Sequence, residues 1–271
     1  MTVKASNRPS ITGLALAVLF LFPLVFDAFD SVHGRAGSAQ SSGFGFGNYT
    51  AMAKYGEGIG TYIFNTAAVS ILTVIVTLVV ATLGGYAFAR FTFPGRNLLF
   101  LCTLAILMVP YATILIPLYV VLGHIGLQDT LVGLALVLAL FQLPFAVFMM
   151  RNAFEALPRE LEEAALVDGC SSFSALRRIL LAGVRPALIT VGLFAFLASW
   201  NDFFAPLILL SDGAKFTLPV AIVGMREQAF GVTDYGALEA GVVVMALPCV
   251  ALFLVLQRHY VQGFTTGAVR G

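Results

Sequence analysis

Six stretches of this chain carry no Asp, Glu, Lys or Arg, and this feature limits the fold more than any other. They cover residues 9–26, 58–89, 97–128, 130–150, 186–201 and 240–257. A helix needs about 20 apolar residues to cross the hydrocarbon of a bilayer. We therefore predict six transmembrane helices, at roughly residues 10–29, 62–89, 98–122, 131–150, 187–210 and 239–258. The fifth stretch is short, so its predicted helix continues past Asp202.

The composition agrees with a membrane protein of the all-α class. Hydrophobic residues make up 59% of the 271 positions and charged residues only 11%, whereas soluble domains are about half apolar and about a quarter charged. The net charge of +1, without a basic patch, gives no indication of nucleic-acid binding.

The distribution of Lys and Arg predicts the orientation of the helices. Alternate loops, which include the two ends of the chain, hold 11 of the 15 basic residues, and the remaining loops hold 4. Because cytoplasmic loops carry the excess of basic residues, both termini are predicted to be cytoplasmic, in a multi-pass protein of the cell (inner) membrane. The predicted parts are an N-terminus (1–9), a single transmembrane domain (10–258) containing a cytosolic loop (151–186), and a cytoplasmic tail (259–271).

The first predicted span also has features of a cleaved signal peptide. Lys4 and Arg8 precede the apolar run, and small residues follow at 37–39. The run is long for a signal peptide, and Asp27 and Asp30 would lie just before the cleavage point. We favour a retained helix, and either alternative leaves the remaining topology unchanged.

No catalytic, cofactor or metal-binding pattern is present in the sequence. The three histidines and the three cysteines are scattered, without the spacing of a metal site or a disulfide framework. The chain lacks the G-x-x-x-x-G-K-[ST] loop that binds ATP phosphates. We therefore predict that it is not an enzyme, and that a transporter built on it takes its energy from a partner or from an ion gradient.

Acidic residues inside the predicted spans are scarce. Asp202 is the clear case, and Glu239 lies at the edge of the sixth span. A charge at the bilayer centre costs several kcal/mol and is usually functional, and ion-coupled carriers need such groups. The scarcity argues against a secondary transporter. Asp202 could equally lie near the outer interface, in contact with water.

The loop 151–186 contains an acidic helix, in the segment EALPRELEEAALVDG at 155–169. Pro158 suits the first turn of a helix, and the glutamates that follow complement the helix dipole. Gly169 can adopt the left-handed conformation that ends a helix. The residues predicted to share one apolar face are Leu157, Leu161, Ala164 and Ala165.

A second short helix is predicted after Gly169, capped by Ser171 or Ser172. Phe173, Leu176 and Leu180 would share one face, with Arg177 and Arg178 near the end. The two helices form an elbow that either docks on another protein or lies on the lipid surface. Interfacial helices favour basic polar faces with bulky anchors. The first helix is acidic and rich in alanine, so we favour protein docking.

These residues resemble the EAA loop of ATP-binding-cassette importer permeases. The resemblance rests on Glu163-Ala164-Ala165, Asp168-Gly169, Ile179 and Pro186. Further segments resemble the carbohydrate (maltose-type) branch: Asn48-Tyr49, Asn65, GGYAFAR at 84–90, MVPYATILIPLY at 108–119, WND at 200–202, TLP at 217–219 and the tail 257–271.

The resemblance implies a type I ABC importer permease fold and a function in carbohydrate import. The elbow would be a coupling helix that docks on a separate ATP-binding subunit through Glu163, Ala164, Ala165, Asp168 and Gly169. The other implied partners are a second permease subunit, which supplies the other half of the pore, an extracytoplasmic sugar-binding protein, the sugar itself and the surrounding lipid. The tail from Gly263 onward would reach toward the ATPase.

Two residues depart from the family pattern after the elbow. Ala182 and Gly183 stand where the family usually has Pro and Leu, so the second elbow helix is expected to continue further or to be more mobile. Cys170 and Thr66 stand where Ala and Ser are common.

For the substrate pathway, Trp200, Asn201 and Asp202 could stack on or hydrogen-bond a sugar, although packing is the favoured role of Trp200 and Asn201. The competing hypotheses are an ion-coupled secondary transporter and a membrane-embedded enzyme.

Overall fold

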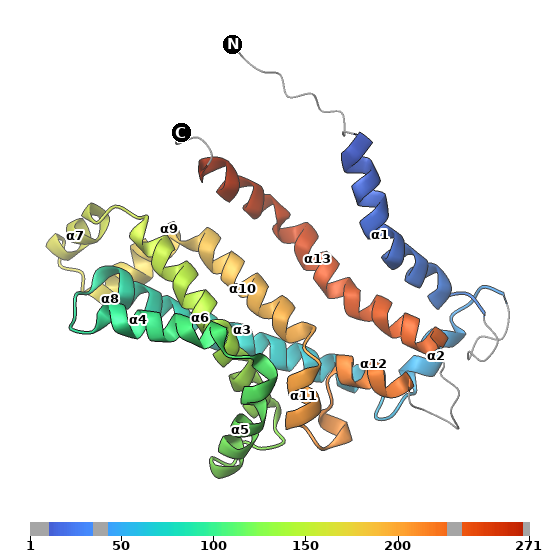
Figure 1. The fold of residues 1–271 in the computed structure, drawn as a ribbon. Helices are drawn as coiled ribbons and strands as arrows, with labels where there is room; N and C mark the ends of the chain where they lie inside the picture. The colour runs from blue at the N-terminus through green and yellow to red at the C-terminus, as the bar shows by residue number, and fades with distance from the viewer. Residues whose placement is uncertain (1–10, 35–42, 227–234, 268–271) are drawn as a thin grey trace. The chain divides into compact units, whose positions relative to one another are not determined.

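The computed structural model describes the backbone of residues 11–34, 43–226 and 235–267 (Figure 1). Within these ranges every regular element is helical, and the one extended pairing is an isolated bridge between His33 and Phe44. The predicted all-α class is confirmed for this part of the chain. The predicted N-terminal segment 1–9, the signal-peptide small residues at 37–39 and the end of the tail lie outside the described residues.

The described helices include five long ones. These are α1 (Ile11–Ser31), α3 (Ile59–Arg90), α6 (Leu131–Glu155), α10 (Arg185–Trp200) and α13 (Tyr235–Gly267). The shorter ones are α2 (Gly47–Ala53), α4 (Arg96–Ala105), α5 (Tyr111–His124), α7 (Glu160–Val167), α8 (Ser172–Ala175), α9 (Leu181–Gly183), α11 (Phe204–Leu209) and α12 (Leu218–Arg226). Two 3₁₀ turns, η1 (Ile106–Met108) and η3 (Gly213–Lys215), and a π-helical stretch, η2 (Leu176–Leu180), complete the set.

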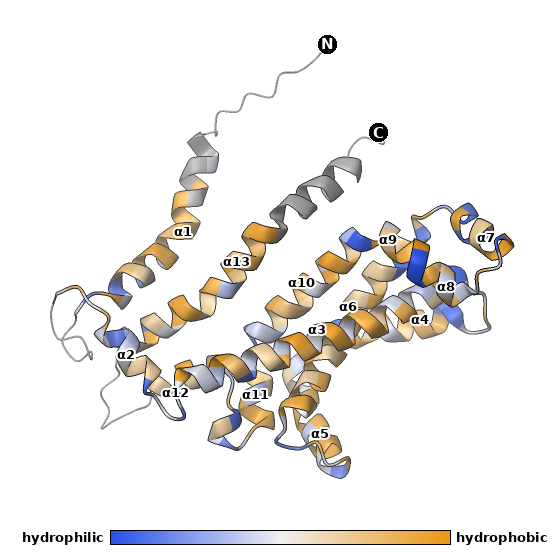
Figure 2. Ribbon diagram, turned by 180° about the vertical axis from the view of Figure 1, so that it is seen from behind, coloured by the Kyte–Doolittle hydropathy of each residue, from blue (hydrophilic) through white to orange (hydrophobic). Residues whose placement is uncertain are grey.

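Three helices in the described part of the chain are long and apolar enough to cross a membrane. They are α3, α6 and the segment Tyr235–Val255 of α13, and two pairs of bent helices raise the number to five if each pair is one span. Figure 2 shows the apolar colour along these helices and polar residues at the turns between them. The first predicted span, at residues 10–29, corresponds to the helix α1.

The third predicted span is not one straight helix. The chain turns through 107° between Arg96–Met108 and Tyr111–His124. The cause is Pro110, which lacks an N–H and which forces the residue before it out of the helical region. Val109 accordingly has an extended ψ of 127°. The prediction of a continuous helix over 98–122 was wrong, because an apolar run does not distinguish a straight helix from a broken one.

The fifth predicted span is also interrupted. The helix α10 ends at Trp200, and α11 begins only at Phe204, after a turn that contains Asp202. The predicted continuation through Asp202 to residue 210 is therefore present as a separate six-residue helix. At its other end, α10 follows the helices of the elbow after a bend of 81°.

The described residues form two compact units. One comprises the described parts of Met1–Ile59 and Ala221–Leu247, and the other those of Gly60–Val220 and Pro248–Gly271. In the first unit, Met52, Met225, Ala237 and Ala240 form a small buried cluster. The buried amide of Asn48 donates to the Ser31 carbonyl at 2.9 Å, which ties α2 to the end of α1.

In the second unit, α6 packs most extensively against α10 and also approaches α3 closely. Gly85 makes this close approach possible, since a Cβ at that position would lie 2.6 Å from Met150 Cβ. Small polar side chains continue the contact along α3, and Thr73 Oγ1 donates to the Ala135 carbonyl at 3.2 Å. Small residues and hydroxyl groups are typical of helix contacts in membranes. The buried members of this stripe on α3 are Thr66, Ser70, Thr73, Thr77 and Ala81.

The elbow and the helices α5 and α11 lie at opposite ends of the second unit. Both ribbon views place α7 and α8 at one end, where α6 ends, and α5 and α11 at the other (Figures 1 and 2). Separate apolar clusters stabilise the two ends. Phe154 and Leu180 belong to the cluster beside the elbow, and Leu115 and Leu209 belong to the one between α5, α6 and α11.

Candidate functional site

The first helix of the elbow begins at Glu160, two residues later than Pro158. The Arg159 carbonyl accepts the first two helical bonds, from the N–H groups of Glu162 at 3.0 Å and Glu163 at 3.1 Å. The prediction that Pro158 lies in the first turn was wrong. Pro158 instead follows a turn that ends α6, where Leu157 N–H donates to the Phe154 carbonyl. The predicted glutamates do occupy the first turn of α7.

The end of α7 agrees with the sequence prediction. Gly169 has a φ of +85°, in the left-handed region. Its N–H donates to the Leu166 carbonyl at 3.0 Å, and the Cys170 N–H donates to the Ala165 carbonyl at 2.9 Å. This pair of bonds is the Schellman arrangement, which satisfies the last carbonyls of a helix and reverses the chain.

The five residues predicted to couple the chain to an ATPase do not share one environment. Glu163, Ala164, Asp168 and Gly169 are exposed, whereas Ala165 is only 3% exposed and packs inside the chain. The predicted apolar face of the helix is also divided, because Leu161 is exposed and Leu157 precedes α7. Other large apolar side chains extend the exposed surface: Leu166, Val167 and Phe173.

The second part of the elbow starts where the sequence indicates. Ser171 caps α8, and its Oγ accepts the Ser174 N–H at 3.3 Å. Leu176 and Leu180 are buried, but Phe173 is 64% exposed, so the predicted common face of these three residues was wrong for Phe173. The π-helical stretch η2 widens the turn and shifts the facing of later residues by comparison with a regular helix.

The residues that replace the family's Pro-Leu lie in a helix. The helical path continues through α9 to Gly183, as expected from the loss of the proline. Gly183 also provides room for a neighbour, because a Cβ there would lie 2.9 Å from Leu157 Cδ2. The side chain of Leu157 thus packs over α9, and the backbone after Leu157 continues into α7.

The helix α7 is fastened to the end of α3 by three polar side chains, which we call the clasp: Tyr86, Arg90 and Glu162. The Tyr86 hydroxyl donates to Glu162 Oε1, and Arg90 Nε lies 3.3 Å from Glu162 Oε2. Arg90 Nη2 also donates to the Leu157 carbonyl at 3.0 Å. The side chains of Arg90 and Glu162 are 6% and 13% exposed, so this ion pair is largely removed from water.

A hollow of about 240 Å³ adjoins the clasp. Charged side chains from α3 and from the elbow segment line this hollow, whereas the surfaces along the long helices are apolar. The lining residues are Arg90, Phe91, Arg159, Glu162, Glu163, Leu166 and Ser172. Such a lining can receive a charged or hydrogen-bonding group of a docked protein. Sequence reasoning singled out Glu163 here but missed the contribution of α3.

The residues predicted for the substrate pathway have three different surroundings. Trp200 is buried, with its ring stacked on Phe196 at a centroid distance of 5.4 Å. Asn201 is exposed, and its Nδ2 donates to the Leu197 carbonyl at 2.8 Å. Asp202 accepts a hydrogen bond of 2.7 Å from the Tyr111 hydroxyl. Tyr111, in the broken third span, was not predicted as its partner.

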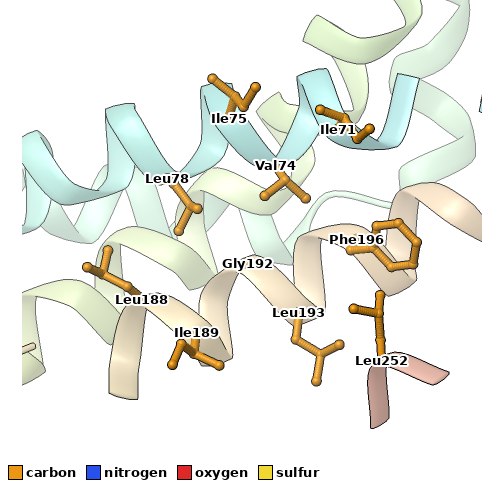
Figure 3. Close-up of a pocket in the computed structure, with 10 residues that line it drawn as sticks. All are labelled: Ile71, Val74, Ile75, Leu78, Leu188, Ile189, Gly192, Leu193, Phe196 and Leu252. Carbon is orange, nitrogen blue, oxygen red and sulfur yellow. The ribbon is translucent and has the colours of Figure 1, made fainter. Parts of the chain in front are cut away.

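One hollow beside these residues is apolar throughout (Figure 3). It measures about 420 Å³, and its lining comes from α3, α10 and α13. The residues are Ile71, Val74, Ile75, Leu78, Leu188, Ile189, Gly192, Leu193, Phe196 and Leu252. None of these side chains can hydrogen-bond, and sugar recognition needs donors and acceptors placed among apolar groups. The lining of this hollow therefore offers no side-chain hydrogen-bond partner to a sugar.

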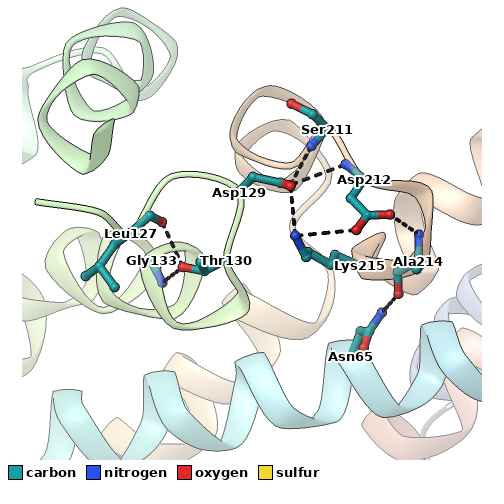
Figure 4. A network of polar contacts seen from close by, with 9 residues as sticks. All are labelled: Asn65, Leu127, Asp129, Thr130, Gly133, Ser211, Asp212, Ala214 and Lys215. Atoms are coloured by element: carbon teal, nitrogen blue, oxygen red, sulfur yellow. Dashed lines mark hydrogen bonds and ion pairs between the residues drawn. The ribbon is translucent and has the colours of Figure 1, made fainter. Parts of the chain in front are cut away.

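A network of charged and polar groups joins two loops at the end opposite the elbow (Figure 4). Asp129 Oδ2 lies 2.9 Å from Lys215 Nζ, and its other oxygen accepts the N–H groups of Ser211 and Asp212. The Lys215 ammonium group lowers the pKa of the Asp129 carboxyl, and the same hydrogen bond raises the pKa of Lys215. The network thus links the loop before α6 to the loop after α11.

The start of α3 is attached to the same loop. Asn65 Nδ2 donates to the carbonyls of Ala214 at 2.8 Å and Phe216 at 3.0 Å. Thr66 Oγ1 accepts the Leu218 N–H at 2.7 Å. Asn65 and the segment TLP at 217–219, which the resemblance picked out separately, are therefore neighbours in space.

Among the residues that the structure describes, no group of three His, Cys, Asp or Glu side chains is placed to hold a metal ion. The cysteines in this part of the chain, Cys102, Cys170 and Cys249, are free thiols. His259 lies outside the described side chains. Among the described residues, polar groups converge in the clasp, at the Asp202 turn and in the loop network, as well as at Asn48 and Asn65.

The chain matches a known family of proteins. The family model for the inner membrane component of binding-protein-dependent transport systems matches residues 81–266. This range contains the clasp, the elbow, the Asp202 turn and the loop network.

Relatives resemble the chain over nearly its whole length. The probable ABC transporter permease protein YurM of Bacillus subtilis is 31% identical over 96% of this chain and 85% of its own. The trehalose transport system permease protein SugB of Mycobacterium tuberculosis is 32% identical over 96% of this chain and 94% of its own.

A solved structure agrees with the fold. It is a chain of a bacterial ABC transporter involved in the import of the acidic polysaccharide alginate, with a TM-score of 0.76 and 22% identity. The match covers 95% of this chain and 99% of that one. The chain belongs to the family of inner membrane components of binding-protein-dependent transport systems.

Proposed function

We propose that this chain is a permease subunit of an ATP-driven carbohydrate importer and forms half of the translocation pore. The observation that carries the proposal is the elbow. Two short helices are joined through the left-handed Gly169, and exposed apolar side chains surround the turn. A membrane protein of this family that exposes Val167 at 86% and Phe173 at 64% outside its long helices has a surface suited to a protein partner.

The proposed topology has six transmembrane helices with both termini in the cytoplasm. It rests on the excess of Lys and Arg in one set of loops, 11 against 4. In this topology the elbow and the clasp face the cytoplasm, and the loop network of Asp129 and Lys215 faces the outside.

The proposed partners supply what this chain lacks. The energy comes from ATP hydrolysis on a separate ATP-binding subunit, because the sequence contains no Walker A loop. A second permease subunit completes the pore, and an extracytoplasmic binding protein delivers the sugar. A related chain, 15% identical with a TM-score of 0.65, was solved in a transporter complex with an alginate pentasaccharide-bound periplasmic protein.

The docking surface is proposed to be the exposed side of the elbow. Glu163, Ala164, Asp168 and Gly169 would face the ATP-binding subunit. Ala165 would act from the inner side, because its small side chain lets α7 lie close to the rest of the chain. The charged hollow beside Glu163 would receive a polar group of the partner.

Carbohydrate is the proposed substrate class because several relatives of the chain have a sugar in their names. They include permeases for trehalose, arabinooligosaccharides and diacetylchitobiose. Within the pathway, Asn201 is exposed and able to reach a sugar hydroxyl, while Trp200 and Asp202 would shape the wall behind it. The runner-up, an ion-coupled secondary transporter, is disfavoured by family membership and by the scarcity of acidic groups in the spans.

The test is purification of the tagged chain from its host membrane in mild detergent, beside Gly169→Trp. Nothing lies within 4 Å of a Cβ at Gly169, so the indole would project outward against a docked partner. Gly126→Trp is the matched control, since Gly126 also has a positive φ and open space but lies before α6, away from the elbow.

The expected result is that an ATPase and a second permease co-purify with the unmodified chain and with Gly126→Trp, whereas Gly169→Trp loses only the ATPase. Uptake of trehalose, arabinooligosaccharide and diacetylchitobiose by cells with and without the chain would then define the sugar. Absence of any ATPase from the unmodified chain, in every detergent, would refute the proposal.

A further inference from the structure

The clasp has an arrangement that docking alone does not require. Glu162 and Glu163 are adjacent in α7, but Glu163 is exposed while the Glu162 side chain is 13% exposed and directed at α3. A surface helix does not need an inward-directed carboxylate in order to bind a partner. The inward glutamate therefore has a role inside this chain.

Each carboxylate oxygen of Glu162 has its own partner on α3. The Tyr86 hydroxyl binds Oε1, and Arg90 Nε lies 3.3 Å from Oε2. Tyr86 and Arg90 are one helical turn apart, so both oxygens are held from the same face of α3. Oε1 accepts a hydrogen bond, and Oε2 is paired with Arg90 by charge, without a hydrogen bond from Nε. The two contacts together restrict the carboxylate and the helix that carries it.

The same arginine holds the entrance to the elbow. Arg90 Nη2 donates to the Leu157 carbonyl, and the Leu157 side chain lies over Gly183 at the end of the elbow. The Tyr86 ring packs edge-on against Phe154 of α6, with centroids 5.6 Å apart. The end of α3 is thus connected to the first elbow helix, to its entrance and to the end of α6.

We infer that Glu162 is a positioning residue which, through Tyr86 and Arg90, makes α7 and the end of α3 move as one rigid body. This inference rests on the proposed function, in which an ATP-binding subunit displaces the elbow. Glu163 then contacts the partner, and Glu162 transmits the displacement to the longest span of the second unit. Breaking an ion pair that is shielded from water leaves the remaining charge uncompensated, so the connection is lost when one partner is removed.

The experiment measures a distance inside the complete transporter. Spin labels are placed on Thr92→Cys, in the exposed segment after α3, and on Leu161→Cys, which is exposed in the first turn of α7 and is not among the residues proposed to face the ATP-binding subunit. The background replaces the native cysteines with alanine: Cys102, Cys170 and Cys249. The complex, with its ATP-binding and second permease subunits, is measured by pulsed electron paramagnetic resonance without nucleotide and after trapping with Mg-ATP and vanadate.

The clasp predicts the same label distance in both states for the unmodified chain. In Glu162→Ala the distance distribution is expected to shift or broaden on trapping. Glu160→Ala is the matched control, because it removes an exposed carboxylate from the same helix, and it should behave as the unmodified chain. Tyr86→Phe keeps the ring and the ion pair, and a smaller shift is expected. If Glu162→Ala fails to assemble, Tyr86→Phe decides the question.

Two outcomes would overturn the inference while leaving the proposed function in place. One is a label distance that changes on trapping in the unmodified chain. The other is an unchanged distance in Glu162→Ala and Tyr86→Phe within assembled complexes. A preparation in which no ATP-binding subunit accompanies the unmodified chain would instead overturn the proposed function, together with the coupling role of the clasp.

Discussion

The Tyr111 hydroxyl donates a hydrogen bond of 2.7 Å to Asp202 Oδ2 and thereby joins α5 to the turn between α10 and α11. The other oxygen, Oδ1, accepts the Ala205 N–H at 2.9 Å, near the start of α11. Both oxygens of Asp202 are therefore engaged in holding the short helix in place. This arrangement gives a structural role to the one clear acidic residue of the predicted spans.

Removal of the hydroxyl by Tyr111→Phe is expected to destabilise the protein by about 1–3 kcal/mol, since a hydrogen bond to a charged group is lost. The measurement is the thermal unfolding midpoint of the purified chain in detergent. Tyr119→Phe on the same helix serves as the control. Equal unfolding midpoints for the two variants would contradict the assignment of the bond.

Thr66→Val is expected to lower the stability by about 1–3 kcal/mol, because the buried Leu218 N–H would lose its acceptor. The same substitution at Thr77 gives a sharp comparison. Thr77 is fully buried on the same helix, but its Oγ1 has no hydrogen-bond partner in the described part of the chain. Thr77→Val should therefore be neutral or stabilising in the same unfolding assay. A similar loss in both variants would show that valine, rather than the missing acceptor, causes the effect.

Adjacent glycines of α3 are predicted to differ in their tolerance of alanine. At Gly85 a Cβ would lie 2.8 Å from the Arg151 backbone nitrogen, so Gly85→Ala must separate α3 from α6 and cost about 1–3 kcal/mol. At Gly84 the nearest atom is a Val147 methyl at 3.5 Å, an ordinary contact. Gly84→Ala should be neutral or stabilise by about 0.5–1 kcal/mol through helix propensity. The yield of monodisperse protein and its unfolding midpoint test both, and the reverse order would refute this packing.

The Asp129–Lys215 pair is predicted to make stability depend on pH. The folded-state pKa of Asp129 is lowered by Lys215, so its contribution is present above the ordinary carboxyl pKa of about 3.9 and is lost as pH falls through the folded value. The unfolding midpoint of the unmodified chain should therefore fall more on acidification than that of Asp129→Asn. High salt should reduce the difference, because both groups are partly exposed. Parallel pH profiles for the two proteins would contradict the prediction.

The local features of the elbow could be predicted from the sequence because they depend on neighbouring residues. A glycine after an acidic, alanine-rich helix and a serine before the next one are read from the chain itself, and Gly169 and Ser171 have those roles. The direction in which each side chain of the elbow faces was harder to predict from the sequence. The alternation of Glu162 and Glu163 between inside and outside depends on where α3 ends, and no sequence spacing reports that.

The breaks in the predicted spans were missed for a different reason. Hydrophobicity measures the environment of a segment, and both halves of a broken helix can be apolar. Pro110 indicates a break in the third span, but the absence of charged residues on both sides of it suggested one continuous helix. The turn at Asp202 had no comparable signal, because its geometry depends on Tyr111, 91 positions away.

The breaks in the third and fifth spans have a joint consequence, because Tyr111 follows one and Asp202 lies within the other. Each break leaves peptide groups without helical partners, and hydrocarbon cannot replace them. Lipid tails must therefore be excluded from this place, either by protein or by water. Between apolar helices, the contact of α5 with the turn after α10 therefore offers polar groups that water can hydrate at the depth of the bilayer.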